Sequence, residues 1–178
     1  MGFIKKAIFV LLIFAALYFA GQQIGLLVAG QKLDFLQGGG TLAKVAGLDA
    51  EYGLAAGQVV PGANLDAYAA KLGALQLRSE DEKNVVNLKL EFTTLTKSLS
   101  AFSALSAKMT GPNQCPNGPQ LLSAYNDAML HANNAKQISA KMGTVKGFES
   151  LSEPGFGAGL GLTISALNET MDTYYTLC

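Results

Sequence analysis

The stretch that decides the fold is residues 79–109, which read SEDEKNVVNLKLEFTTLTKSLSAFSALSAKM. Its large apolar residues recur at spacings of three and four, the period of one face of an α-helix. These residues are Val85, Leu88, Phe92, Leu95, Leu99 and Phe102. Such a face predicts a long helix packed inside a bundle of helices. It indicates no substrate and no reaction.

Sequence signals mark both ends of this long helix. Ser79 and Glu82 fit a capping box, in which each side chain accepts a hydrogen bond from the backbone N–H of the other residue. The apolar pattern of residues 64–77 is offset by one residue from that of the long helix, so a new helix is predicted to begin at Ser79. A glycine and a proline shortly after Met109 predict the other end.

Four more helical segments are predicted from the same periodicity, over residues 41–56, 64–77, 119–142 and 160–178. Thr41 and Asn64 are candidate N-caps for the first two segments. The segment 119–142 has a small inner face that suits close packing on the long helix. This face consists of Leu121, Tyr125, Ala128, Ala132, Ala135 and Met142. The glycine-rich residues 143–159 are predicted to be a flexible connection.

These segments predict an all-α protein, with an N-terminal transmembrane helix followed by an antiparallel four- to five-helix bundle over residues 41–178. Short connections favour antiparallel neighbours. The arrangement of the helices within residues 41–77 stays open, because they could form two antiparallel pieces or one bent element.

The N-terminal segment is predicted to anchor the chain in a membrane. The 25 residues between Lys6 and Lys32 carry no charge, and a helix needs about 20 such residues to cross a bilayer. We therefore expect a signal-anchor helix over residues 1–32 and a flexible linker over residues 33–40. Lys5 and Lys6 should stay in the cytoplasm, which places the rest of the chain outside it. The alternative is a cleaved signal peptide, which leaves the same domain outside the cytoplasm.

Within the predicted anchor, Gly21, Gly25 and Ala29 recur at every fourth residue. Small residues at this spacing let a second membrane helix approach closely. These three residues are a possible helix-packing face. The alternative is that they reflect only the general abundance of glycine and alanine in membrane helices.

Charge argues against nucleic acid as a partner. The chain has 13 basic and 13 acidic residues, and its single arginine is Arg78. Without Lys5 and Lys6, 11 basic residues face 13 acidic ones, and the lysines are scattered. Phosphate binding needs a concentrated basic face, which this distribution does not supply.

The two cysteines, Cys115 and Cys178, are the most specific feature of the sequence. In an antiparallel bundle the loop before residue 119 and the end of the last helix meet at the same end. An extracytoplasmic location permits oxidation, so we predict a Cys115–Cys178 disulfide. Free thiols and a bridge between chains are the alternatives.

No residue pattern predicts a cofactor, a metal site or a catalytic site. His131 is the only histidine, and it is expected on the surface beside the small face of its helix. No Glu-x-x-His pair, haem-attachment motif or nucleophile motif is present. The outer face of the long helix, with Lys83, Asn87, Glu91 and Thr94, is expected to be solvated.

Two further features have structural alternatives. The tyrosines are expected to pack in the core with their hydroxyls at its edge, although a ligand pocket between helices is the alternative. Asn168, Glu169 and Thr170 form a possible glycosylation sequon, which lies on a predicted helix.

The leading functional hypothesis is a non-enzymatic, single-span membrane protein whose extracytoplasmic helical bundle acts as a structural or interaction module. It would be an accessory subunit of an envelope or membrane complex, with a protein partner or a second copy of itself. The alternative is a domain that binds or senses a small ligand and needs a partner for its output.

Overall fold

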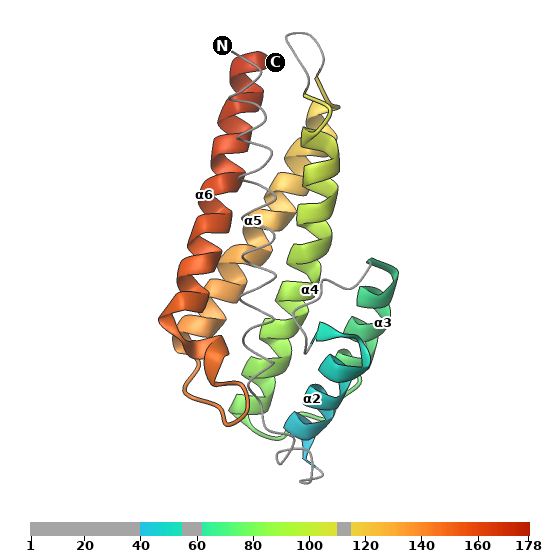
Figure 1. Cartoon of the computed structure of the whole chain (residues 1–178), viewed down its shortest axis with the longest axis vertical. Coiled ribbons are helices and arrows are strands. Elements are labelled where there is room, and N and C mark those ends of the chain that lie inside the picture. Colours follow the sequence, from blue (N-terminus) through green and yellow to red (C-terminus); the bar gives the residue numbers. More distant parts are fainter. Residues whose placement is uncertain (1–39, 55–61, 110–114) are drawn as a thin grey trace.

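The computed structural model describes residues 40–54, 62–109 and 115–178. This part of the chain contains five α-helices, one short 3-10 helix and no strand (Figure 1). The all-α prediction is confirmed. The elements are α2 (Thr41–Glu51), α3 (Gly62–Gly73), α4 (Glu80–Ser106), α5 (Gly118–Lys141), η3 (Glu149–Ser152) and α6 (Pro154–Leu177).

The predicted membrane anchor over residues 1–32 lies outside the described residues, and so do Gly21, Gly25 and Ala29. Of the predicted linker 33–40, only Gly40 is described. Among the helices that the structure does describe, none is both long enough and apolar enough to span a bilayer.

The start of α4 follows from its capping box, as predicted. The Glu82 backbone N–H donates to Ser79 Oγ at 3.1 Å, and the Ser79 N–H donates to Glu82 Oε2 at 3.2 Å. The helix ends at Ser106, three residues before the predicted end, and a turn continues to Met109. The cap therefore defines one end of the longest helix in the described part of the chain.

Two faces of α4 are covered. Five of the six predicted apolar positions are buried, and the sixth, Phe92, is partly buried with its ring 5.1 Å from that of Phe156. Val86 and Thr93 are also buried, on a different side of the helix. Periodicity identified the first face only, because the second is short and includes a hydroxyl.

The small face of α5 packs along α4 and also contacts α6 (Figure 1). Residues along it have small side chains and are buried, so the helices can approach closely. The buried positions within the helix are Leu121, Ala124, Ala128, Ala132, Ala135 and Ser139. Tyr125 is only partly buried, and Met142 is buried just after the helix ends.

Helix α6 begins earlier than predicted. Residues 154–159 are helical instead of forming part of a flexible connection, and Pro154 occupies the first turn. Phe156 is buried four residues before Leu160, so it extends the apolar face toward the N-terminus. This packing outweighs the low helix propensity of the glycines in the segment.

Helices α2 and α3 form an antiparallel hairpin, which resolves the arrangement left open by the sequence. The Thr41 hydroxyl donates to the backbone carbonyl of Gln76, and Tyr68 bonds Asp49 near the other end of α2. The hairpin lies beside the first half of α4 (Figure 1). We use "hairpin" below for α2 and α3 together.

Both predicted caps of the hairpin are wrong. Gly40 is the N-cap of α2, while the Thr41 hydroxyl donates to the Gln76 carbonyl, just after α3. Helix α2 ends at Glu51, before the predicted Ala56, and Gly53 has a positive φ of 71° directly after it. Asn64 lies within α3, which begins at Gly62.

Candidate functional site

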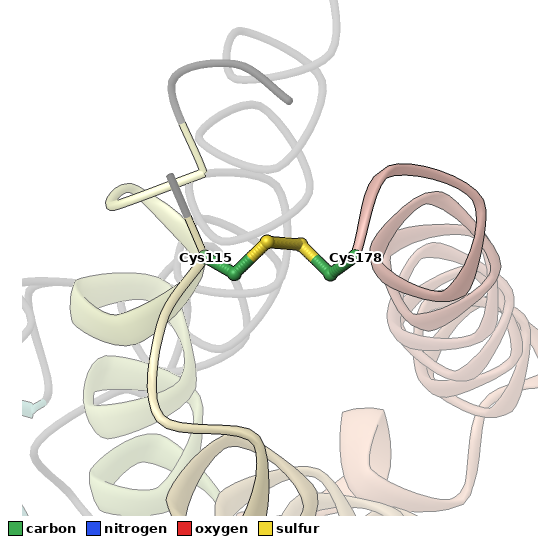
Figure 2. Close-up of a disulfide and its surroundings, with 2 residues drawn as sticks. All are labelled: Cys115 and Cys178. Atoms are coloured by element: carbon green, nitrogen blue, oxygen red, sulfur yellow. A yellow bond between two sulfur atoms is a disulfide. The ribbon is translucent and has the colours of Figure 1, made fainter. Parts of the chain in front are cut away.

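The disulfide between Cys115 and Cys178 joins the loop before α5 to the end of α6 (Figure 2). Their Cα atoms are 6.0 Å apart, and 63 residues separate them in sequence. The predicted pairing is confirmed. In the chain-entropy description, closing a loop of this length stabilises the fold by about 4 kcal/mol. We call this end of the bundle the disulfide end.

Tyrosines complete the packing between α5 and α6 near the disulfide end. The Tyr174 hydroxyl lies so close to Gly118 that a side chain at that position would collide with it. The Tyr125 hydroxyl donates to the Asn168 side-chain carbonyl at 2.6 Å. Tyr125 and Tyr174 both pack against the core, whereas Tyr175 is 65% exposed. The expected core packing is therefore confirmed for the first two residues.

The possible sequon at Asn168 lies within α6. Asn168 is exposed, but its side chain accepts the hydrogen bond from Tyr125. Thr170 is fully buried, and its hydroxyl donates to the Ala166 carbonyl. Glycosylation of Asn168 stays a prediction.

A buried polar cluster joins the hairpin to α4. Asp49 on α2 is fully buried, and Tyr68 on α3 is 1% exposed. The Tyr68 hydroxyl donates to Asp49 Oδ1 at 2.6 Å, and Lys89 Nζ on α4 lies 2.7 Å from Asp49 Oδ2. One carboxylate is thus shared by α3 and α4. We refer to these three residues as the Asp49 cluster.

The Asp49 cluster also reaches the connection between α5 and α6. The Lys89 ammonium lies 5.3 Å from the centre of the Phe148 ring, a cation–π geometry. Only 11% of the Lys89 side chain is exposed. This single ammonium group therefore contacts α2 on one side and the α5–α6 connection on the other.

Burial sets the energetics of this cluster. Burial, together with the charge of Asp49 and the hydrogen bond to it, raises the pKa of the Tyr68 hydroxyl far above its usual value. Tyr68 therefore stays a neutral donor. Removing one partner of a buried ion pair costs about 3–5 kcal/mol, because the other charge is left without compensation.

The sequence contained a signal for the Asp49 cluster that periodicity alone could not interpret. Asp49 lies four residues after Val45 and three before Tyr52, on the apolar side of α2. Lys89 lies three residues after Val86 and four before Thr93, on the hairpin side of α4. A charged residue on the buried face of each helix indicates an ion pair only when these two faces are known to pack against each other.

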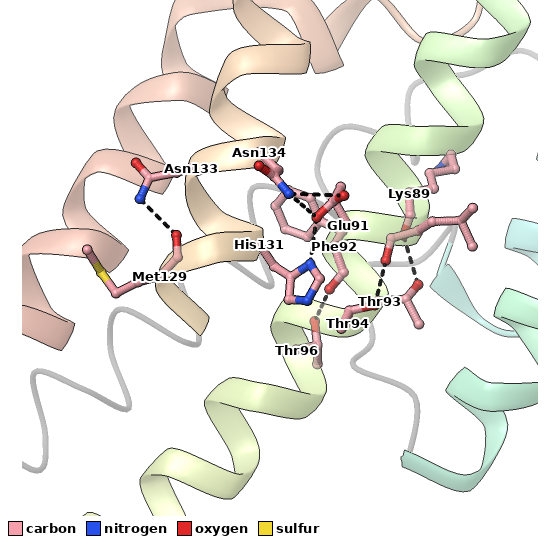
Figure 3. A network of polar contacts seen from close by, with 11 residues as sticks. Lys89, Glu91, Phe92, Thr93, Thr94, Thr96, Met129, His131, Asn133 and Asn134 are labelled. Carbon is pink, nitrogen blue, oxygen red and sulfur yellow. Dashed lines mark hydrogen bonds and ion pairs between the residues drawn. The ribbon is translucent and has the colours of Figure 1, made fainter. Parts of the chain in front are cut away.

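A second polar cluster joins α4 to α5. His131 Nδ1 lies 2.6 Å from Glu91 Oε2, and Asn134 Nδ2 is 3.4 Å from both oxygens of the same carboxylate (Figure 3). The His131 and Glu91 side chains are each 23% exposed. The expectation that Glu91 is solvated is wrong, and His131 is less exposed than expected. Lys83, Asn87 and Thr94 are exposed, as expected.

Chemically, the arrangement at Glu91 orients an imidazole by a carboxylate, and both groups lie between two packed helices. Such a pair can hold helices in register and can orient a proton donor or acceptor. Within the described ranges, no group of three or more His, Cys, Asp and Glu side chains could hold a metal ion.

Comparison with known proteins assigns no family. No protein-family model, no curated protein and no solved structure matches the chain. Function is therefore inferred from the disulfide, the two polar clusters between helices and the exposed surface of the bundle.

Proposed function

We propose that the chain is a membrane-anchored, extracytoplasmic helical bundle that acts as a structural or interaction module, as an accessory subunit of an envelope or membrane complex. The Cys115–Cys178 disulfide is the observation that carries this proposal. Structural disulfides persist in oxidising compartments and are rare in reducing ones. The disulfide therefore supports a location outside the cytoplasm.

The uncharged, mostly apolar residues 7–31 supply the proposed anchor. They precede α2, whose first residues lie at the end of the bundle opposite the disulfide (Figure 1). With the linker 33–40 between anchor and bundle, the disulfide end would point away from the membrane. Exposed surfaces on α5 and α6 would then be accessible to neighbouring proteins.

Helix α6 offers the surface that best supports an interaction role. Residues 154–168 contain no charged side chain, and Leu162 within this stretch is 68% exposed. Single exposed leucines are common on monomers, but a long uncharged helix surface is less so. Leu130 on α5 is a second large apolar residue, 55% exposed. These side chains would be covered in a complex.

Topology is tested in intact cells with a membrane-impermeant maleimide. The variant Asn126→Cys places a thiol on the exposed side of α5, and Gly2→Cys places one before the proposed anchor. We expect labelling of Asn126→Cys in intact cells and labelling of Gly2→Cys only after permeabilisation. The reverse pattern would rule out an extracytoplasmic bundle.

The interaction role is tested by measuring the mass of the full chain in complexes isolated from native membranes in mild detergent. We expect a mass well above the 18.6 kDa of one chain. Leu162→Asp should lower it, whereas Asn87→Asp, an exposed change on α4, should not. A monomer in the unsubstituted protein would refute the subunit proposal.

A further inference from the structure

Lys89 is the point where the hairpin and the α5–α6 connection meet on α4. Its ammonium group lies 2.7 Å from Asp49 Oδ2 of α2 and 5.3 Å from the ring centre of Phe148. Phe148 is 2% exposed and belongs to the connection, residues 142–153. Two segments separated by about a hundred residues thus share one buried cation.

The hairpin depends on this region for much of its polar attachment to α4. Among the described residues, the hairpin's other ion pair with α4 joins Asp66 to Lys97, and both side chains are exposed. The pair between Lys71 and Glu51 lies within the hairpin and is also exposed. Exposed ion pairs contribute little to stability, whereas removing one partner of a buried ion pair lowers the free energy of unfolding strongly. The hairpin is therefore held by its apolar side chains and by the Asp49 cluster.

The connection has its own local hydrogen bonds, which can report its opening. The backbone N–H groups of Phe148, Leu151 and Glu153 donate to the carbonyls of Val145, Phe148 and Ser150, respectively. These amides exchange with solvent only when the connection opens. In the hairpin, the Tyr52 N–H donates to the Leu48 carbonyl and reports the end of α2.

We propose that the hairpin and the α5–α6 connection open from α4 as one cooperative unit, and that Lys89 couples them. When the hairpin leaves, Asp49 is withdrawn and Lys89 becomes a cation with no carboxylate in an otherwise buried position. The ammonium then moves toward water and leaves the face of the Phe148 ring. The connection then loses its contact with Lys89 and keeps its packing on α5 and α6 and the Ser139 hydrogen bond to the Leu151 carbonyl, so it is held less firmly and opens more often. Helices α5 and α6 stay joined by the disulfide.

This coupled opening does not depend on the proposed function, because it uses only contacts within the bundle. It has a consequence for any partner or anchor that moves the hairpin. Such a movement would change the connection that leads into α6, the helix with the uncharged surface. A two-state element of this kind is what transmits a change between two sites in a protein.

Hydrogen exchange of the full, oxidised chain tests the coupling. We expect Asp49→Asn to speed exchange at the Tyr52 amide and also at the Phe148 and Leu151 amides, in each case by about tenfold or more. In a Lys89→Met background, Asp49→Asn should no longer affect the two amides of the connection. Asp66→Asn is the matched control, because it removes only the exposed pair with Lys97 and should leave the connection unchanged.

Reciprocity gives a second, independent readout. If Lys89 couples the two segments, the coupling acts in both directions, so Phe148→Leu should also speed exchange at the Tyr52 amide. Exchange that rises only in the hairpin after Asp49→Asn would overturn the proposal. The proposal would also be overturned if Asp49→Asn sped exchange in the connection as much in the Lys89→Met background as in the unsubstituted protein. Circular dichroism and a thiol assay verify that each variant is folded and oxidised.

Discussion

The disulfide end of this bundle is held together by a covalent bond, whereas the hairpin is held on α4 by noncovalent contacts. At the disulfide end, a covalent bond between Cys115 and Cys178 joins the loop before α5 to the residue that follows α6. The hairpin is held on α4 by apolar packing and by one buried ion pair, Asp49 with Lys89. The covalent bond acts in the unfolded chain as well as the folded one, whereas the ion pair exists only while both partners stay in place.

This difference separates two kinds of stability. The disulfide limits how far α5 and α6 can separate under any condition that leaves it oxidised. The hairpin can leave α4 without breaking a covalent bond, so its stability can fall well below that of the rest of the bundle. The comparison can be tested by weakening each end in turn.

The largest effect is expected from removing the disulfide. The double variant Cys115→Ser and Cys178→Ser should lower the free energy of unfolding by about 4 kcal/mol, because the unfolded chain regains the entropy of an open loop. Urea denaturation followed by circular dichroism measures this change. Treating the unsubstituted protein with a reductant should give the same loss. A loss below about 1 kcal/mol in both would mean that the disulfide does little for this fold.

Breaking the ion pair at the hairpin comes next. Lys89→Met should cost about 3 kcal/mol, since it leaves the Asp49 carboxylate buried without its cation. The double variant Asp49→Leu and Lys89→Met removes both charges, and it should recover most of that loss. Urea denaturation of both variants measures the difference. If the double variant is as unstable as the single one, packing rather than charge controls this site.

Two glycine substitutions compare the packing at the two ends of the α5–α6 pair on a smaller scale. Gly118→Ala should destabilise by about 1–2 kcal/mol, because the new methyl group meets the Tyr174 hydroxyl near the disulfide. Gly157→Ala on the first half of α6 meets no atom within 4 Å, so it should stabilise by up to about 1 kcal/mol through helix propensity. Thermal denaturation of both variants checks the opposite signs. Equal signs would contradict this difference in packing.

The smallest effect concerns pH at the start of α4. The Arg78 backbone N–H, with help from that of Ser79, holds the pKa of Glu82 below its usual value of 4.5. A lowered folded-state pKa adds stability above the unfolded value, and this stability is lost as pH falls through the folded value. Glu82→Gln should therefore flatten the decline in melting temperature below about pH 4.5.

Asp81→Asn is the control for that pH profile, because Asp81 is exposed in the same first turn of α4 and takes no part in the capping box. It should leave the decline on the acid side nearly as steep as in the unsubstituted protein. A profile for Glu82→Gln that matches the unsubstituted one would show that the capping carboxylate does not drive the acid sensitivity.

Local signals predicted much of the bundle. The Val85 to Phe102 face and the box at Ser79 depend on residues close in sequence, so periodicity and hydrogen-bonding chemistry identified them. The disulfide followed from topology, because an antiparallel path brings both cysteines to one end. The early start of α6 could not be predicted in this way, because its glycines have low helix propensity and the burial of Phe156 depends on distant residues.

The polar clusters could not be predicted for a different reason. Asp49 and Lys89 are 40 residues apart, and nothing local indicates that their helices touch. Glu91 was expected on the solvated face of α4, but it lies three residues after Leu88 and four before Leu95, at the edge of the apolar face. It meets His131 there because α5 packs on this side. Pairing between distant charges becomes visible only when the placement of the hairpin and of α5 is known.

The covalent ring closed by Cys115 and Cys178 also determines how this molecule would respond to a pulling force. Tension applied between the start of α2 and Cys178 would pass from residue 115 directly to residue 178 through the sulfur atoms. The hairpin and α4 could extend by roughly 3.5 Å for each residue released, while α5 and α6 would bear no tension. Single-molecule stretching of the oxidised chain should therefore lengthen only the part before Cys115, and reduction should release the remainder.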